Sequence, residues 1–230
     1  MPTGPSDSAL GSSEEIEIAY LDDHLLAAVK PAGLLSVPGR GPENADCLST
    51  RLQQFYPDAL IVHRLDMATS GLILFARSVS VQRLLGLAFQ TRSISKRYIA
   101  VVHGNLQAQP VDGHGWGLID LPIGADWNSR PRRQIDKHAG KPSQTRWQPT
   151  GYDATSDTTT LMLDPLTGRT HQLRVHLQAI GHPIVGDALY GWPTDKASRL
   201  LLHATELRLD HPIQGVTLTV RSPAPFQRQI

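Results

Sequence analysis

The 230-residue chain has one cysteine, no long apolar run and almost no net charge. Cys47 has no second cysteine for a disulfide and cannot form a CxxC zinc or redox site, which fits a reducing compartment. No stretch of about 18 apolar residues is present, and residues 1–11 lack the basic and apolar regions of a signal peptide. We therefore expect a cytoplasmic protein that neither spans a membrane nor is secreted.

Common catalytic signatures are also missing. The chain has no GxxxxGK[ST] loop, no GxGxxG after a strand, no HExxH, no GxSxG elbow and no cysteine cluster. His171 and His176 are five residues apart, which places them on different faces of a helix, so we expect no metal pair. What is left is a cofactor-free mechanism that uses side chains.

The near-zero net charge hides an uneven distribution. Overall, 22 Lys and Arg face 21 Asp and Glu, but residues 1–25 hold six acids and no base, so the other 205 residues carry +7. Seventeen of the bases are Arg, whose planar fork suits phosphate and base edges, although the codon usage of a GC-rich genome would give the same excess. Charge alone therefore does not decide whether the partner is a nucleic acid.

The order of apolar and turn-forming segments predicts one α+β domain. Residues 1–14 are typical of a disordered acidic leader, and we expect the folded domain over 15–226. A hairpin is predicted over 16–33, followed by strands over 59–62, 72–76, 98–102, 158–163, 200–203, 206–209 and 216–220. Three helices are predicted. The first follows an Asp46 cap and has Leu48, Leu52 and Phe55 on its apolar face, the second follows Ser80, and the third includes Leu173, Leu177 and Ile180. Without a βαβ rhythm, this order indicates a mixed, largely antiparallel twisted sheet flanked by helices and loops.

The first candidate for chemistry is Asp66, at the end of a predicted buried strand and before a polar turn. A strand end exposes a side chain while the sheet fixes its direction, so a short carboxylate there is well placed for catalysis. An Asp that accepts turn amide hydrogens, or that pairs with Arg64, would give the same pattern. The residues alone leave both interpretations open.

Two other segments place polar residues at structural transitions. Residues 167–176 hold two Arg, two His and one Gln where a turn enters a helix, with Arg174 at the margin of the buried face. An Arg there is costly unless a carboxylate pairs with it, whereas the same cluster on the surface would be a solvated helix start. In the segment 96–98, strand alternation points Tyr98 away from Arg97, and core packing would equally explain the tyrosine.

Together these segments resemble the RluA family of pseudouridine synthases in order and spacing. The likeness is carried by KPAGLLSVPG at 30–39, HRLDMATSG at 63–71, KRY at 96–98, GRTHQLRVH at 168–176, GHPIVGD at 181–187 and LLLHA at 200–204. It extends over roughly residues 16–225, and it is greatest to members that act on both a tRNA anticodon stem-loop and 23S rRNA. About 15 residues precede the first predicted strand, too few for the N-terminal S4 RNA-binding domain of several relatives, so we expect a monomeric catalytic domain without one.

The resemblance implies a reaction, an isomerisation of uridine to pseudouridine in RNA without cofactor or metal. The family's essential aspartate corresponds to Asp66, its active-site tyrosine to Tyr98 and its arginine to Arg174. Asp66 would trap or stabilise the charge at the sugar, or take its 2′ proton, and Arg174 would keep Asp66 ionised. Tyr98 would stack on the detached base and help to remove the C5 proton.

Such an enzyme must take the uridine out of its stack and hold the surrounding RNA. Residues 126–146 contain six bases, two acids and a Trp, which favours a grip on the RNA backbone, with a solvated loop as the alternative. Arg64 would fill the vacated space or hold the adjacent phosphate. The RNA contacts that we expect are Arg64, Arg130, Arg132, Arg133, Arg169, His171 and Gln172.

Two other functions remain open at the level of sequence. One is a retaining glycosidase or nucleoside hydrolase that uses Asp66 with Asp120 or Asp187, and the other is a non-catalytic RNA-binding module. The Gly-rich segment at 111–117 departs from the family pattern, and we expect it to influence which RNA is accepted.

Overall fold

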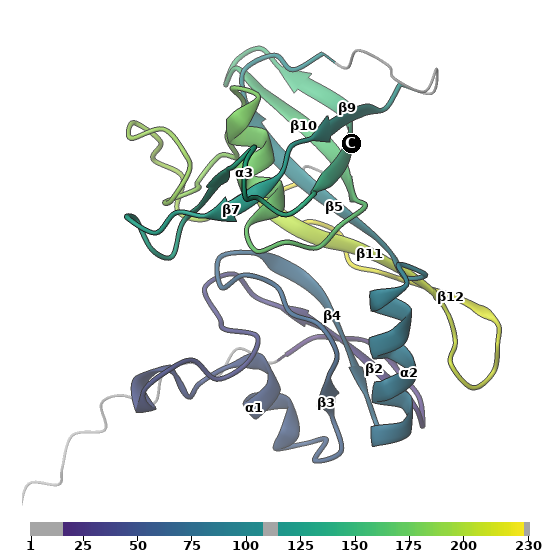
Figure 1. Ribbon diagram of the computed structural model, residues 1–230. Helices are drawn as coiled ribbons and strands as arrows, with labels where there is room; N and C mark the ends of the chain where they lie inside the picture. The colour runs from purple at the N-terminus through teal and green to yellow at the C-terminus, as the bar shows by residue number, and fades with distance from the viewer. Residues whose placement is uncertain (1–15, 108–114, 228–230) are drawn as a thin grey trace, which may run out of the picture.

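The computed structural model describes residues 16–107 and 115–227 and is built around a ten-stranded sheet (Figure 1). Its strands follow the order β1-β2-β4-β11-β5-β10-β9-β6, while β3 pairs with β4 and β12 with β11. The strands of this sheet are β1 Ile18–Leu21, β2 Leu25–Lys30, β3 Leu60–Ile61, β4 Ser70–Ala76, β5 Ser95–His103, β6 Gly117–Asp120, β9 Gln144–Asp153, β10 Thr158–Pro165, β11 Leu202–Asp210 and β12 Thr217–Arg221. A separate hairpin consists of β7 Ile123–Ala125 and β8 Arg133–Ile135.

Antiparallel pairing dominates this sheet, as predicted. The described pairs are antiparallel except β4 with β11, which runs parallel through Ser70 opposite His203 and Gly71 opposite Ala204. A side chain on Gly71 would collide with the backbone of Ala204, and the φ of Gly71 is +114°. The glycine therefore allows the two strands to approach, directly after the loop that carries Asp66.

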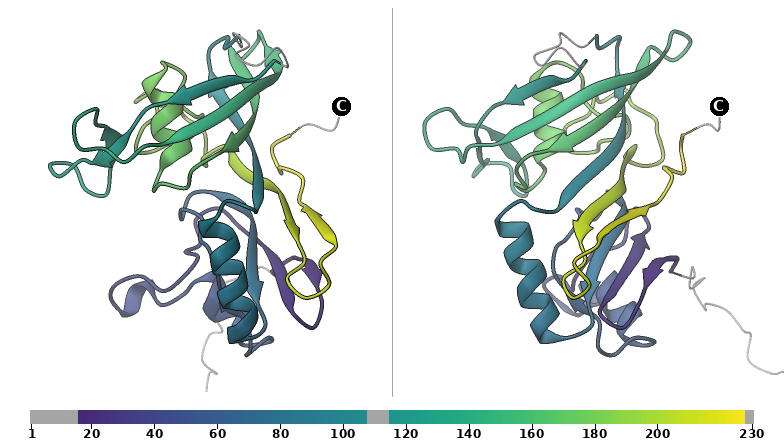
Figure 2. Two further views of the ribbon diagram at one scale, coloured as in Figure 1. Left: turned by 45° about the vertical axis from the view of Figure 1, so that its right-hand side comes forward. Right: turned by 90° about the vertical axis from the view of Figure 1, so that its right-hand side faces the viewer.

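The strands and helices gather into two lobes (Figures 1 and 2). The first lobe, residues 16–91, contains β1 to β4 with α1 Leu48–Gln53 and α2 Val79–Gln90. The second, residues 117–200, contains β6 to β10, α3 Gln172–Ala179 and the segment after α3, which packs on the same core. Strands β5 and β11 run between the lobes. Apolar side chains of β2, β4 and α2 form the core of the first lobe, and those of β10 and α3 contribute to the core of the second.

Helix α1 differs from its predicted form. Its N-cap is Cys47, whose Sγ accepts a hydrogen bond from the Thr50 amide at 3.5 Å, so the predicted Asp46 cap is wrong. Asp46 instead pairs with Arg51 at 2.7 Å, and Phe55 lies beyond the helix with 79% of its surface exposed. The apolar spacing predicted the helix, but the predicted apolar face wrongly includes Phe55, which lies past the end of the helix.

Other predicted elements are confirmed with shifted bounds. Helix α2 starts after a Ser78 cap rather than after Ser80. The two strands predicted over 200–209 form one strand, β11, while the strand predicted over 59–62 is reduced to two residues. The predicted leader, residues 1–14, and positions 111–114 of the Gly-rich segment lie outside the described residues. In the part of the chain that the structure describes, no helix is long and apolar enough to cross a membrane.

Candidate active site

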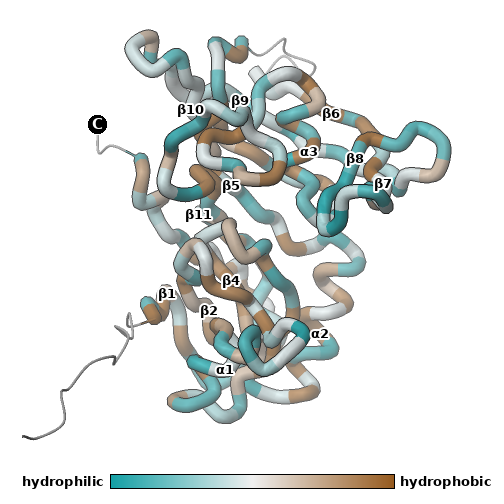
Figure 3. The backbone as a smooth tube through the Cα atoms, turned by 90° about the vertical axis from the view of Figure 1, so that its left-hand side faces the viewer, coloured by the Kyte–Doolittle hydropathy of each residue, from teal (hydrophilic) through white to brown (hydrophobic). Residues whose placement is uncertain are grey.

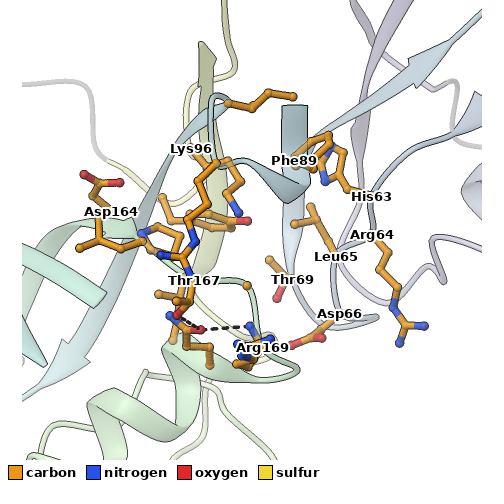
Figure 4. A pocket seen from close by; sticks show the side chains of 18 of the residues that line it. His63, Arg64, Leu65, Asp66, Thr69, Phe89, Lys96, Asp164, Thr167 and Arg169 are labelled. Atoms are coloured by element: carbon orange, nitrogen blue, oxygen red, sulfur yellow. Dashed lines mark hydrogen bonds between the residues drawn. The ribbon is translucent and has the colours of Figure 1, made fainter. Parts of the chain in front are cut away.

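A cavity of about 950 Å³ contains most of the predicted site residues (Figure 4). It is lined by the loop after β3, the start of β5, the end of β10 and the start of α3. The predicted residues that line it are Asp66, Tyr98, Arg174, Arg64, Arg169, His171 and Gln172. The fold thus brings three segments together that are distant in the sequence.

Asp66 enters the cavity from the first lobe. Its side chain is 21% exposed, and its backbone carbonyl accepts the amide of Thr69, which closes the turn into β4. Figure 4 shows the carboxylate directed towards the Arg169 side of the cavity. The Ser36 hydroxyl holds the preceding residue from both sides, because it donates to the Leu65 carbonyl at 2.8 Å and accepts the Leu65 amide at 3.1 Å. The carboxylate is therefore presented by a fixed backbone.

Two further side chains fix the Asp66 loop. The ammonium of Lys30, which is fully buried, donates to the carbonyls of Pro31, Leu34 and Met67 at 2.7 to 3.0 Å. Burial lowers its pKa to about 7, although the charge of Asp66 acts in the opposite direction. The Nε2 of His63 accepts the Leu74 amide at 2.9 Å, and burial lowers the pKa of His63 to about 3, so its ring is neutral.

Arg174 lies between two carboxylates. Its Nε and Nη2 donate to Asp187 at 2.8 and 2.7 Å, while its Nη1 lies 3.6 Å from Oδ2 of Asp66. The arginine is only 4% exposed and the Asp187 side chain is 0% exposed. Sequence reasoning expected a carboxylate beside Arg174 but missed that the closer one is Asp187, which orients the guanidinium for Asp66.

His171 approaches the other oxygen of the same carboxylate. Its Nε2 is 3.9 Å from Oδ1 of Asp66, and its Nδ1 is hydrogen-bonded to the hydroxyl of Tyr190 at 2.8 Å. The residue is the N-cap of α3 with φ 57° and ψ 18°, a left-handed conformation that is uncommon for a residue with a side chain. Burial lowers its pKa, while Asp66 acts to raise it.

Tyr98 lies on β5 and packs against core clusters on both sides of the cavity. Burial raises the pKa of its phenol well above the usual value, and the nearby charge of Asp66 raises it further. The side chain is therefore neutral at physiological pH. Tyr98 both packs against the core and lines the cavity, so the two alternatives that the sequence left open apply together.

The other predicted residues around the cavity differ in their freedom to bind. Arg64 is exposed and extends from its loop away from Thr167 (Figure 4). Arg169 is also exposed, with long contacts of 3.4 and 3.5 Å to the Pro142 carbonyl. Gln172 is buried, and its amide accepts from Thr167 and the Arg169 amide and donates to Gln144 and Thr145. These four bonds use both donor hydrogens and both acceptor lone pairs of the amide, so Gln172 stabilises the loop before α3.

The three predicted arginines of residues 126–146 lie on the β7–β8 hairpin rather than in the cavity lining. Arg130 is exposed and stacks on Trp127 with 4.4 Å from its guanidinium carbon to the ring centre. Arg132 packs over Tyr190 at 5.4 Å, and the Nε of Arg133 is buried without a hydrogen bond among the described atoms. Figure 3 shows the end of this hairpin as hydrophilic. The three side chains therefore have different surroundings.

The carboxylates of the hydrolase alternative are not arranged as a catalytic pair. Asp187 is buried and bound to Arg174, and Asp120 accepts a hydrogen bond from Gln144 outside the cavity lining. His171 and His176 have different partners: His171 is hydrogen-bonded to Tyr190, whereas His176 is fully buried against Thr145 and Leu121. Among the described residues, no group of three His, Cys, Asp or Glu side chains is arranged for a metal ion.

Sequence reasoning did not assign four residues of this region, namely Lys30, Lys96, Asp187 and Tyr190. Lys96 lines the cavity, where burial lowers its pKa and Asp164 acts to raise it. Lys30, Lys96 and Asp187 lie in the motifs that carry the family resemblance, where Asp187 is predicted only as a second carboxylate of a hydrolase. For Tyr190 no pattern in the sequence indicated a contact with His171.

Comparisons with known proteins agree with this geometry. A family model described as RNA pseudouridylate synthase matches residues 24–179. The dual-specificity RNA pseudouridine synthase RluA of Escherichia coli K12 is 46% identical over 211 residues, which cover 91% of this chain and 93% of that protein. The RluA of Vibrio vulnificus is 48% identical over 201 residues, with 85% and 78% covered. The solved structure of human RNA pseudouridylate synthase domain containing 1 matches with a TM-score of 0.77 at 30% identity and covers 96% of this chain and 88% of that one.

The family model spans more than half of the chain, and the bacterial relatives match along almost all of it. The matched residues include both sides of the cavity, from the Asp66 loop to α3. The chain therefore belongs to the family of RNA pseudouridine synthases, enzymes that isomerise uridine to pseudouridine in RNA.

Proposed function

We propose that Asp66 is the catalytic carboxylate of this isomerisation. The observation that carries the proposal is the placement of one partly exposed carboxylate in the cavity, with Arg174 and His171 within 4 Å of its two oxygens. When the C1′–N1 bond breaks, the electron pair goes to uracil N1 and positive charge develops at the sugar. Asp66 either bonds to C1′ or takes the 2′ proton, and the geometry of the free protein is compatible with both.

The remaining steps use the neighbours of Asp66. The guanidinium of Arg174 stabilises the carboxylate charge and is itself held by Asp187. Tyr98 stacks on the detached uracil while the ring turns. C5 then bonds to C1′ as the Asp66–C1′ bond breaks, or, in the other route, as Asp66 returns the proton to C2′. C5 loses its proton to water, and N1 gains one. Because its phenol is neutral, Tyr98 supplies a flat surface and a hydrogen-bond donor rather than a phenolate base for the C5 proton.

We further propose that the substrates are a tRNA anticodon stem-loop and a 23S rRNA stem-loop. The support is the likeness to relatives whose names state dual specificity, at 46% identity over most of the chain. Arg64, exposed beside Asp66, is placed to occupy the space of the flipped uridine or to hold the adjacent phosphate. The exposed Arg169 and the β7–β8 hairpin would hold the RNA backbone, with residues 15–226 acting as one monomeric domain.

The experiment compares short RNAs that carry tritium at uridine C5. We expect release of tritium to water, with the base still attached, from an anticodon stem-loop and from a 23S rRNA stem-loop. The matched control is each RNA with its uridine placed in the paired stem, which should release at least about tenfold less because the base must unstack. Free uracil would show a hydrolase, and binding without release would show a non-catalytic RNA-binding module. Release from one RNA alone would contradict dual use.

The role of Arg64 has its own test. Replacement Arg64→Ala should weaken RNA affinity, turnover or both, because the charge beside the flipped base is lost. Unchanged values of both quantities would refute this role. Because Arg64 is exposed, its replacement should change the stability of the fold little, and thermal unfolding of the variant would check this.

A further inference from the structure

Tyr190 connects three parts of the site that the reaction scheme treats separately. Its hydroxyl accepts the backbone amide of Arg133 in β8 at 2.7 Å and is bonded to Nδ1 of His171 at 2.8 Å. Its ring, only 3% exposed, lies 5.0 Å from the guanidinium carbon of Arg174 and 5.4 Å from that of Arg132. The tyrosine thus contacts the hairpin, the histidine and the catalytic arginine at once.

The direction of these hydrogen bonds follows from the chemistry of the groups. A backbone amide can only donate, so the Tyr190 oxygen is the acceptor for Arg133 and its own proton is free to point at His171. The oxygen has a second lone pair and could accept from His171 as well, but no other acceptor among the described residues lies within hydrogen-bond distance of the Tyr190 proton. We therefore assign this proton to Nδ1 of His171, which accepts it and carries none. In the neutral ring the proton must be on Nε2, the atom that faces Asp66 at 3.9 Å.

We propose that Tyr190 is a positioning residue that fixes His171 in the Nε2–H tautomer, so that the ring donates to Oδ1 of Asp66 while Arg174 holds Oδ2. The inference rests on the proposed role of Asp66 as the catalytic carboxylate. The distance of 3.9 Å exceeds that of a hydrogen bond, so the proposal requires this contact to shorten when RNA binds, as catalytic contacts often do. The two donors together fix the rotation of the carboxylate.

The backbone of His171 supports this assignment. The residue holds a left-handed conformation, and such conformations at residues with a side chain tend to persist where function requires them. The conformation places the imidazole between Tyr190 and Asp66 at the start of α3. The charged and titratable groups that face this ring are Asp66, Arg174, Asp187, Arg133 and Tyr190.

The connection to β8 gives the hairpin a route to the catalytic carboxylate. A displacement of β8 on RNA binding would move the Arg133 amide, and the hydroxyl of Tyr190 would have to follow or lose its donor. The orientation of His171 would change in the same step. The hairpin that we propose to hold RNA is therefore linked to His171 through two hydrogen bonds, and His171 in turn lies 3.9 Å from Asp66.

The first test is spectroscopic and does not need activity. In protein labelled with ¹⁵N-histidine, long-range ¹H–¹⁵N correlations distinguish the two tautomers, and the signals of His171 are assigned by their loss in His171→Gln. We expect the Nε2–H form in the unaltered protein near neutral pH and a mixture of tautomers in Tyr190→Phe, which keeps the ring but removes the hydroxyl. An Nδ1–H form in the unaltered protein, or an unchanged tautomer in Tyr190→Phe, would overturn the proposal.

The second test is a double-mutant cycle on tritium release. Tyr190→Phe should lower kcat about five- to tenfold with little change in KM, the loss expected for one oriented hydrogen bond. In a His171→Gln background the same replacement should change kcat less than about twofold, since the ring that it orients is gone. Equal losses in both backgrounds would show that Tyr190 acts in another way.

A control replacement separates this effect from the loss of any tyrosine hydroxyl. Tyr152 donates to Asp157 at an exposed position on β9, and Tyr152→Phe should leave kcat unchanged. A different result would show that the proposed function is wrong. In that case Asp66→Ala would still release tritium, whereas the tautomer of His171 in the unaltered protein would be the expected one. The two proposals can therefore fail separately.

Discussion

The two walls of the cavity are built in different ways. The first lobe contributes Asp66 on a loop that is fixed by backbone hydrogen bonds, by Ser36 and by the buried Lys30. The second lobe contributes charged and polar side chains that are held by other side chains: Asp187 binds Arg174, and Tyr190 is hydrogen-bonded to His171. The carboxylate that we propose as catalytic and its electrostatic surroundings thus come from separate lobes, and the candidate site exists only where the lobes meet.

This difference predicts different consequences of substitution. In the first lobe all seven residues of β4 are buried, and the loop with Asp66 is supported by an apolar core. In the second lobe the buried ion pair of Arg174 and Asp187 supports the site directly, and a buried charge that loses its partner is strongly destabilising. The following experiments test the contrast, from the largest expected change to the smallest.

The largest loss of stability is expected from breaking the buried pair. Arg174→Met leaves the fully buried Asp187 carboxylate without its counter-ion and should lower the free energy of unfolding by about 3–5 kcal/mol. Combining it with Asp187→Leu should recover part of the stability without recovering activity, although the amides of Leu189 and Tyr190 lose their acceptor. Urea unfolding and tritium release measure the two quantities. Unchanged stability in Arg174→Met would contradict the contrast between the walls.

Acid should destabilise the strand that joins the lobes. Burial lowers the pKa of His203 on β11 to about 4, below its value of 6.5 in an unfolded chain. The unfolded state therefore binds the proton first, and the stability contributed by the neutral ring is complete above pH 6.5 and is lost as the pH falls towards 4. Between pH 7 and 5 this costs about 2 kcal/mol.

The measurement is urea unfolding at both pH values for the natural chain and for His203→Gln. The variant should lose about 2 kcal/mol less on acidification, and the difference isolates His203 from other groups such as His63, which acts in the same direction. Tryptophan fluorescence and circular dichroism should follow one transition, because β11 joins both lobes. An equal acid effect in both proteins would show that the ring of His203 is not the group responsible.

A smaller effect is expected at the strained start of α3. Because His171 has a φ of 57°, His171→Gly should be more stable than His171→Ala by about 1 kcal/mol, although glycine is normally the less stable choice. Both variants lose the imidazole and should lose activity alike. Thermal unfolding of the two variants therefore measures the strain of the left-handed backbone at position 171 separately from the role of the imidazole in activity. Greater stability of His171→Ala would show that the left-handed conformation carries no strain.

The smallest change in stability is expected at the tip of the hairpin. Arg130→Gln removes an exposed charge and should alter the free energy of unfolding by less than about 0.5 kcal/mol. It should lower the slope of log affinity against log salt by about one if Arg130 contacts one phosphate. Arg208→Gln, on the distal part of β11, is the matched control and should leave the slope unchanged. Removing the charges of Arg132 and Arg133 as well tests whether several arginines share the RNA contact, since the Arg132 guanidinium packs on Tyr190 and the Arg133 charge acts on His171.

The sequence was sufficient for elements whose cause is local. Period-two and helical patterns predicted β1 to β5, β10 to β12, α2 and α3, whereas β6 to β9, in a Gly- and Pro-rich region, were not delimited. The polar turn before β4 drew attention to Asp66, although β3 ends already at Ile61. The need of a buried arginine for a carboxylate predicted a partner for Arg174, but 13 residues separate it from Asp187 and no periodicity selects between Asp187 and Asp66.

Contacts between distant segments could not be predicted. Tyr190 binds the Arg133 amide 57 residues away through a backbone atom, so no side-chain type at position 133 signals the contact. The same holds for Lys30, whose three acceptors are carbonyls, one of them 37 residues away. At α1 the error was chemical, because Cys47 serves as the cap next to an Asp that has the higher preference for that position.

The central claim is that Asp66 from the first lobe carries out the chemistry in surroundings provided by the second. The most direct measurement is tritium release from a C5-labelled anticodon stem-loop by Asp66→Ala, with RNA binding measured on the same preparation. We expect release to fall by at least about 10³-fold, because the carboxylate is lost from every step at the sugar, while RNA binding persists. Tritium release by Asp66→Ala at a rate near that of the natural chain would contradict the account.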